Sequence, residues 1–209
     1  FTTVQSARQD GIFRGQAVVA STGKGLPGEL ILKADGQHFL SFDPGSSKQS
    51  YPSSLMGSIA LVRQTLADAQ WYQQAYGKTD WRLFREPAPF NAALAALGQL
   101  NQSGLVFEIS NERNLLRADS LLKEFNLPKV ALVASGYEYV RAAEVKKTGR
   151  NLIVPVAYPA APSVGKLDDQ LDVSLADLRH WERAPTNPAA LEKAGVNFAL
   201  TTHKLDDKT

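Results

Sequence analysis

The sequence contains no cysteine and only three histidines among its 209 residues. The absence of cysteine excludes disulfides, thiolate nucleophiles and cysteine-ligated zinc, and it is compatible with either redox compartment. No apolar run reaches the roughly 18 residues of a membrane-spanning helix, so we predict no membrane span. The opening FTTVQSARQDG lacks both a methionine and the basic-then-apolar pattern of a signal peptide. We therefore expect the chain to be a piece of a longer protein.

The sequence also lacks an excess of charge of either sign. The chain carries 23 basic and 21 acidic residues, which gives a net charge of +2. These charges are spread along the sequence, so no broad positive field is available to attract nucleic acid or anionic lipid. We predict that nucleic acid is not a partner. The 44% hydrophobic content is sufficient for a buried core.

From residue 104 onward, short apolar runs alternate with helical patterns. The predicted strands cover 105–109, 130–134, 152–157 and the segment VNFALTT near the end. Between the first two, Leu115, Ala118, Leu122 and Phe125 recur at helical spacing and predict an amphipathic helix. Strands that alternate with helices are typical of a parallel α/β sheet, either a barrel or an open doubly wound sheet.

The first half of the chain has a different pattern. Three strand-like segments (12–21, 28–34 and 37–42) predict a β-rich segment over residues 1–50, and βα units fill 51–209. We expect both parts to belong to one domain, 1–209, with a helix from 52 to 72. The segment GKGLPG matches G-x-G-x-x-G, but Pro27 and the strand-like ELILK after it favour a turn over a phosphate site.

The carboxyl ends of the predicted strands carry the candidate site, because chemistry in parallel α/β folds lies there. These positions are Glu108, Ser110, Ser135, Glu138 and His203. Glu108 and Ser110 are two residues apart and face the same side of a strand. A structural interpretation remains open, in which Ser110 and Asn111 cap a helix, Ser135 begins a tight turn and His203 is solvated.

The other two histidines fit no catalytic motif. His38 falls in a strand-like segment and is interpreted as a surface or hydrogen-bonded residue. His180 falls inside LADLRHWER, where packing on a helix face is favoured over catalysis. There is no G-x-S-x-G element, and the serines of YPSSLMG precede a helix, where serine is a common cap.

Several motifs in fixed order resemble the imidazolonepropionase-like branch of the metal-dependent amidohydrolases. They are FTTVQ, RGQAVV, YPSSLMGSIALVRQTLADAQWY, EISNERNLLRADSLLKEFNLPKVALVASGYEY and WERAPTNPAALEKAGVNFALTTH. The resemblance covers nearly the whole chain and extends to large two-part chains of bacteria. It implies a partial (β/α)₈ TIM-type amidohydrolase barrel, roughly strands 3–8, with a β-rich N-terminal segment. Members of the family hydrolyse amide or related C–N bonds with metal-activated water.

The ligand pattern that the resemblance implies is missing from this sequence. Members carry an H-x-H pair on the first strand, histidines after the fifth and sixth strands and an aspartate after the eighth. Here no H-x-H occurs, Glu108-Ile109-Ser110 replaces the fifth-strand histidine, Ser135-Gly136-Tyr137-Glu138 replaces an H-G-T-E, and His203 replaces the aspartate. Glu108 and His203 are weak candidate metal ligands, and no bridging lysine is identified.

The resulting hypothesis is a degenerate amidohydrolase-like domain with a structural or ligand-binding role in a larger hydrolase chain. We expect no catalytic residues and no cofactor in these 209 residues, with zinc or a similar divalent metal only if the family activity is retained. One alternative is an active amidohydrolase whose other ligands lie outside the sequence. Another is a carbohydrate- or peptide-binding module. Its aromatic residues would be Trp71, Tyr72, Tyr76, Trp81 and Phe84.

The expected partner follows from the incomplete barrel. Missing opening strands leave unpaired sheet edges and an uncovered barrel interior. We therefore expect these residues to associate with the remainder of their parent chain or to form a homo-oligomer. The residues do not define a compartment, although resemblance to exported bacterial proteins favours the periplasm.

Overall fold

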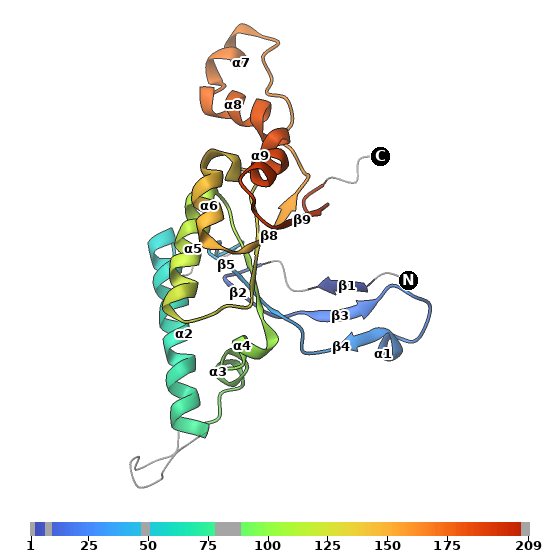
Figure 1. The fold of residues 1–209 in the computed structure, drawn as a ribbon, viewed down its shortest axis with the longest axis vertical. Helices are drawn as coiled ribbons and strands as arrows, with labels where there is room; N and C mark the ends of the chain where they lie inside the picture. The colour runs from blue at the N-terminus through green and yellow to red at the C-terminus, as the bar shows by residue number, and fades with distance from the viewer. Residues whose placement is uncertain (1–2, 7–9, 47–50, 78–88, 206–209) are drawn as a thin grey trace. The chain divides into compact units, whose positions relative to one another are not determined.

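The chain folds as a mixed α/β protein with two sheets (Figure 1). The computed structural model describes residues 3–6, 10–46, 51–77 and 89–205. One sheet has the strand order β1-β3-β4, and the other has the order β2-β5-β6-β7-β8-β9. The α/β prediction is confirmed. No closed barrel is formed by the described part of the chain.

The residues group into two compact units, each described by itself below. The first contains residues 1–107 and 120–130, and the second contains 108–119 and 131–209. The prediction of one domain over 1–209 stays a prediction.

The first unit begins with antiparallel strands and one helical turn. Their bounds are β1 Thr3–Ser6, β2 Phe13–Gln16, β3 Val18–Ser21, α1 Pro27–Leu30, β4 Ile31–Lys33 and β5 His38–Ser41. β3 pairs with β1 and β4, and β2 pairs with β5. The G-x-G-x-x-G segment lies between β3 and β4, and it contains part of α1, where a plain turn was predicted. A helix of four residues followed directly by a strand does not make the phosphate-binding helix of a dinucleotide site.

Three helices complete the main part of this unit: α2 Leu55–Gly77, α3 Ala92–Leu97 and α4 Leu100–Ser103. α2 buries a stripe at three-and-four spacing, made of Val62, Leu66, Ala69, Tyr72 and Ala75. Leu55 fits the same helical spacing, but its side chain is 37% exposed. Leu55 is the first helical residue, and the buried stripe begins two turns later.

The segment β6 Leu105–Glu108, α5 Glu112–Glu124 and β7 Val130–Val133 follows the predicted strand–helix–strand pattern. α5 begins after Asn111, whose side-chain Oδ1 accepts a hydrogen bond from the Asn114 amide at 2.9 Å. This N-cap pairs one of the amides that a helix start leaves without an intrahelical partner. The predicted helix face is confirmed, since Leu115, Ala118 and Leu122 are fully buried.

The rest of the second unit consists of short helices and two further strands. Their bounds are η1 Glu138–Arg141, α6 Ala142–Thr148, β8 Asn151–Pro155, α7 Leu167–Asp172, α8 Leu175–Arg183, η2 Ala184–Thr186, α9 Asn187–Lys193 and β9 Phe198–Thr201. β7, β8 and β9 are parallel, with Leu132 opposite Leu152 and Leu152 opposite Phe198. Parallel pairing brings the carboxyl ends of these strands to one edge.

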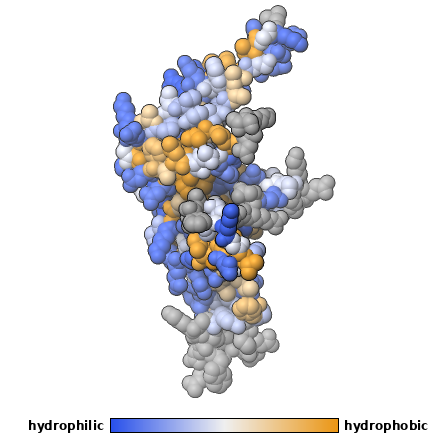
Figure 2. All heavy atoms as spheres, turned by 90° about the vertical axis from the view of Figure 1, so that its right-hand side faces the viewer, coloured by the Kyte–Doolittle hydropathy of each residue, from blue (hydrophilic) through white to orange (hydrophobic). Residues whose placement is uncertain are grey.

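The face shown in Figure 2 has hydrophilic areas and separate apolar areas. Exposed apolar side chains in the second unit include Leu171, Leu175 and Trp181. Exposed single apolar residues are ordinary on protein surfaces and do not by themselves define a binding face. Among the described helices, none has the length and hydropathy needed to cross a bilayer.

Candidate functional site

Glu108 lies at the last position of β6 and binds a lysine that follows β9. Its Oε1 is 2.7 Å from Lys204 Nζ and 3.7 Å from His203 Nε2. The Glu108 side chain is 16% exposed, whereas that of Lys204 is 56% exposed. The structure thus brings together two predicted site residues, Glu108 and His203. It adds a cation that the sequence analysis did not single out.

The turn after β9 places His203 and Lys204 beside Glu108. The His203 amide donates to Thr201 Oγ1 at 3.2 Å, and the Leu205 amide donates to the Thr202 carbonyl at 2.9 Å. Lys204 adopts a positive φ of 67°. A positive φ is uncommon outside glycine, asparagine and aspartate, so the sequence gives no signal for this turn at a lysine. The only available signal for Lys204 was its position next to a strand end that faces a glutamate.

Ser135 and Glu138 form a second, separate arrangement inside the second unit. Glu138 is fully buried. Its Oε1 accepts hydrogen bonds from the Ser135 amide and the Ser135 hydroxyl, both at 2.7 Å. Its Oε2 accepts from the Gly136 amide at 2.9 Å and from Asn187 Nδ2 at 3.0 Å. Four donors satisfy the carboxylate, which therefore stabilises the turn after β7 and connects it to α9.

Ser110 makes a third, local arrangement. Its Oγ accepts a hydrogen bond from Asn114 Nδ2 at 2.8 Å, and Asn114 Oδ1 accepts from Arg117 Nη1 at 2.8 Å. Asn114 is itself buried. These contacts lie at the start of α5 and support the capping region of that helix.

His180 packs between two tyrosines, in agreement with its predicted packing role. Its ring stacks on that of Tyr137, with centroids 3.5 Å apart and planes 6° apart. The Tyr139 hydroxyl lies 3.3 Å from His180 Nδ1. Burial lowers the pKa of His180, and nearby Glu138 and Asp177 oppose that shift.

His38 is not at the surface, which was one of its two predicted placements, and its ring is only partly satisfied by hydrogen bonds. It is 4% exposed, and its Nε2 has no hydrogen-bond partner among the described residues. Burial lowers the pKa of His38, while the backbone carbonyl of Ala96 acts against this shift by accepting a hydrogen bond. The ring therefore favours its neutral form.

The aromatic residues considered for a carbohydrate or peptide site divide into two groups. Trp81 and Phe84 lie outside the described residues. Tyr72 is buried in α2, where its hydroxyl accepts a hydrogen bond from the Asn91 amide at 2.9 Å, and its ring stacks on Tyr76. Tyr72 is therefore a packing residue, whereas Trp71 and Tyr76 are each about half exposed.

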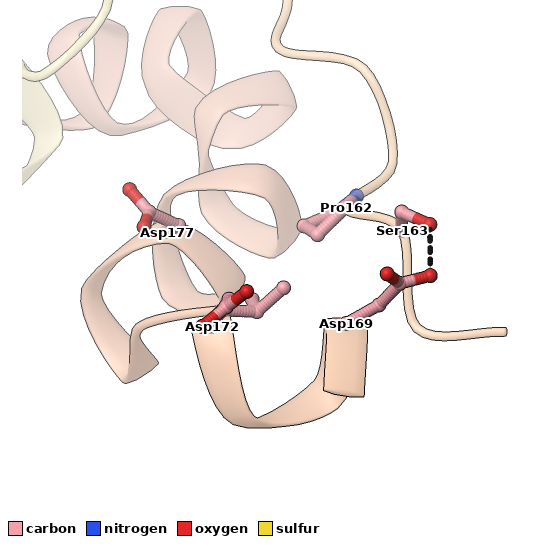
Figure 3. Close-up of a pocket in the computed structure, with 6 residues that line it drawn as sticks. Pro162, Ser163, Asp169, Asp172 and Asp177 are labelled. Atoms are coloured by element: carbon pink, nitrogen blue, oxygen red, sulfur yellow. Dashed lines mark hydrogen bonds between the residues drawn. The ribbon is translucent and has the colours of Figure 1, made fainter. Parts of the chain in front are cut away.

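A shallow pocket of about 420 Å³ in the second unit gathers three carboxylates, from Asp169, Asp172 and Asp177 (Figure 3). Two of them have local partners. Ser163 Oγ donates to Asp169 Oδ2 at 3.1 Å, and Ser174 Oγ donates to Asp177 Oδ2 at 2.6 Å. The Ser174 and Asp177 contact is part of the N-cap of α8. Local structure therefore explains Asp169 and Asp177.

A catalytic metal does not fit the described residues. No group of three or more histidine, aspartate or glutamate side chains in the described ranges is arranged to hold a metal ion. Catalytic zinc sites use three protein ligands and leave a position for water. Among the carboxylates and imidazoles that the structure describes, Glu108 and His203 lie near each other at the ends of β6 and β9, and the ammonium of Lys204 lies against the same Glu108 oxygen.

The architecture is amidohydrolase-like, as comparison with solved structures shows. A crystal structure of an amidohydrolase from Thermotoga maritima MSB8 superposes with a TM-score of 0.70 at 16% identity. The match covers 98% of this chain and 51% of that one, so the chain spans about half the length of this neighbour. The sequence matches no protein-family model and no curated protein. The similarity therefore establishes the fold alone.

Proposed function

We propose that these residues form a degenerate amidohydrolase-like domain that lacks metal catalysis of its own. In this proposal the domain has a structural or ligand-binding role within a larger hydrolase chain. The observation that carries the proposal is the 2.7 Å ion pair between Glu108 and Lys204. It places a cation of the chain against the carboxylate that lies 3.7 Å from His203.

The charges at this position explain why the ion pair matters. A divalent metal bound by Glu108 and His203 would lie close to the Lys204 ammonium, and like charges at such separations repel. Lys204 would have to move away, and the metal would still have only two of the three protein ligands that a catalytic zinc site uses. The ion pair thus supplies the countercharge that a metal would otherwise provide.

We also propose that the six-stranded sheet is part of an incomplete barrel. The support is the similarity in fold to an amidohydrolase, which covers 98% of this chain and 51% of that one, together with the sequence resemblance, whose family folds as barrels.

Metal content of the full chain tests the proposal. We would load the purified protein with zinc, remove free metal, and measure bound zinc by plasma mass spectrometry in wild type and in Glu108→Ala/His203→Ala. Equal zinc content in both proteins is the expected result. Glu144→Ala serves as a matched control, because Glu144 is a half-exposed glutamate of the same unit that pairs with Arg141. Loss of one full equivalent of zinc in the double variant alone would overturn the proposal.

A further inference from the structure

A small pocket of about 130 Å³ lies within the first unit and is lined mainly by α2, α3 and α4. Leu66 of α2, Leu100 of α4 and Phe125, which directly follows α5, form its apolar floor. All three side chains are buried. The volume is below the range of pockets that take drug-sized molecules. The pocket therefore has room for a molecule with a single small ring.

Three side-chain amides lie at the rim of this pocket, those of Gln70 and Gln73 of α2 and of Asn101 of α4. All three residues are exposed, so a ligand can reach their amides. The amides of Gln70 and Asn101 have no hydrogen-bond partner among the residues that the structure describes. None of the described lining residues carries a charge. The pocket thus combines neutral donors and acceptors with an apolar floor.

Gly98 fixes the position of the Gln73 amide at this rim. Gln73 Nε2 donates to the Gly98 carbonyl, and a Cβ at residue 98 would overlap the Gln73 side chain. The glycine therefore permits this contact, although its φ of −64° and ψ of −15° suit any residue. The carbonyl uses one hydrogen of the amide, which leaves the second hydrogen and Oε1 for a ligand.

We propose that this pocket binds a free neutral polyol of single-ring size, of the cyclitol class, whose hydroxyls pair with the Gln70, Gln73 and Asn101 amides. A hydroxyl both donates and accepts, so it can pair with either end of an amide. The C–H groups of the ring contact the apolar floor. An ion is disfavoured because no described lining residue offers a countercharge. The inference does not rest on the proposed function, which concerns other residues.

The test compares three neutral probes on the full chain. myo-Inositol has a hydroxyl on every carbon of its ring, cyclohexanol has the same ring with a single hydroxyl, and N-methylacetamide represents a peptide group. Affinities would be measured by NMR titration of the side-chain amide resonances. For myo-inositol we expect a Kd of about 1 mM, as its size allows. The other two probes should bind at least about fivefold more weakly, which corresponds to one net hydrogen bond.

Variants separate the amides from the floor. Gln73→Ala should weaken myo-inositol binding roughly fivefold and should affect cyclohexanol less. Gly98→Ala should have the same effect, because the new methyl group displaces the Gln73 amide without removing it. Gln74→Ala is the matched control, because Gln74 is an exposed glutamine of the same helix that does not line the pocket. It should bind myo-inositol as wild type does.

Three results would overturn the inference. The first is that myo-inositol at about 20 mM, roughly twenty times the expected Kd, shifts none of the Gln70, Gln73 and Asn101 amide resonances of folded wild type. The second is binding of cyclohexanol or N-methylacetamide at least as tight as that of myo-inositol. The third is equal affinity of Gln73→Ala and Gln74→Ala for myo-inositol. If Gly98→Ala does not fold, these last two variants still decide the question.

Discussion

Replacing Glu138 with glutamine should strongly destabilise the second unit, although the two side chains have nearly the same shape. Each carboxylate oxygen of Glu138 accepts one backbone amide and one side-chain donor. A glutamine side chain offers one oxygen and one NH₂ group. Whichever way the amide is oriented, the NH₂ group faces either the Ser135 amide or the Gly136 amide. One partly buried backbone N–H therefore loses its acceptor.

The expected cost is about 2–4 kcal/mol. A hydrogen bond to a charged group contributes about 1.5–3 kcal/mol, and an unpaired buried donor costs about 1–3 kcal/mol, with some overlap between the two terms. Neighbouring groups can replace the lost hydrogen bond only in part. The Ser135 hydroxyl can rotate, but an amide flip of Asn187 would turn its NH₂ toward the Tyr139 amide, which now donates to Asn187 Oδ1 at 2.7 Å.

Urea unfolding combined with amide hydrogen exchange would measure this effect. The amides of Ser135, Gly136 and Tyr139 should exchange faster in Glu138→Gln, and the free energy of unfolding of the second unit should fall by the stated amount. Glu144→Gln is the matched control, because the partner of Glu144 is the half-exposed Arg141 and such pairs contribute about 0–1 kcal/mol. Wild-type stability and exchange in Glu138→Gln would refute the reasoning.

Two further predictions concern buried charges. Unfolding free energy should decrease as the pH falls below 6.5, since burial lowers the pKa of His38 and His180 in the folded chain and the unfolded chain then binds more protons. Urea titrations at pH 7.5 and 5.5 measure this free energy. The prediction is contradicted if the loss of stability between the two pH values is as large in His38→Phe and in His180→Phe as in wild type. Asp119→Ala should cost about 3–5 kcal/mol, because it leaves Arg150 nearly buried without its 2.9 Å partner. Thermal unfolding tests this, and a melting temperature equal to that of wild type would contradict it.

The sequence was most informative where burial imposes a period. The helix after β6 was predicted from four apolar residues, and the structure buries all four because only one face of α5 contacts a core. β7 and β8 were predicted from continuous apolar runs. Periodicity did not locate the first buried apolar residue of α2, because Leu55 fits the helical period but lies in the first turn of the helix and is exposed.

The candidate site was predictable only as a set of strand ends. Parallel strands bring their carboxyl ends to one edge, and this rule alone placed Glu108 near His203. It did not identify Lys204, whose position depends on a positive φ that the residue type disfavours. Nor did it reveal that Glu138 is bound by Asn187, 49 residues further along the chain, because the packing of α9 determines that contact.

The Glu108 ion pair gives a reason for a carboxylate at the end of a strand that does not involve a metal. A carboxylate that is 16% exposed loses much of its hydration, which is unfavourable unless a cation or several donors lie nearby. Lys204 meets this need while its own head group stays largely in water, so only one of the two charges is desolvated. An acidic residue at this position is therefore weak evidence for metal binding, and the side chains that surround it are more informative than the residue itself.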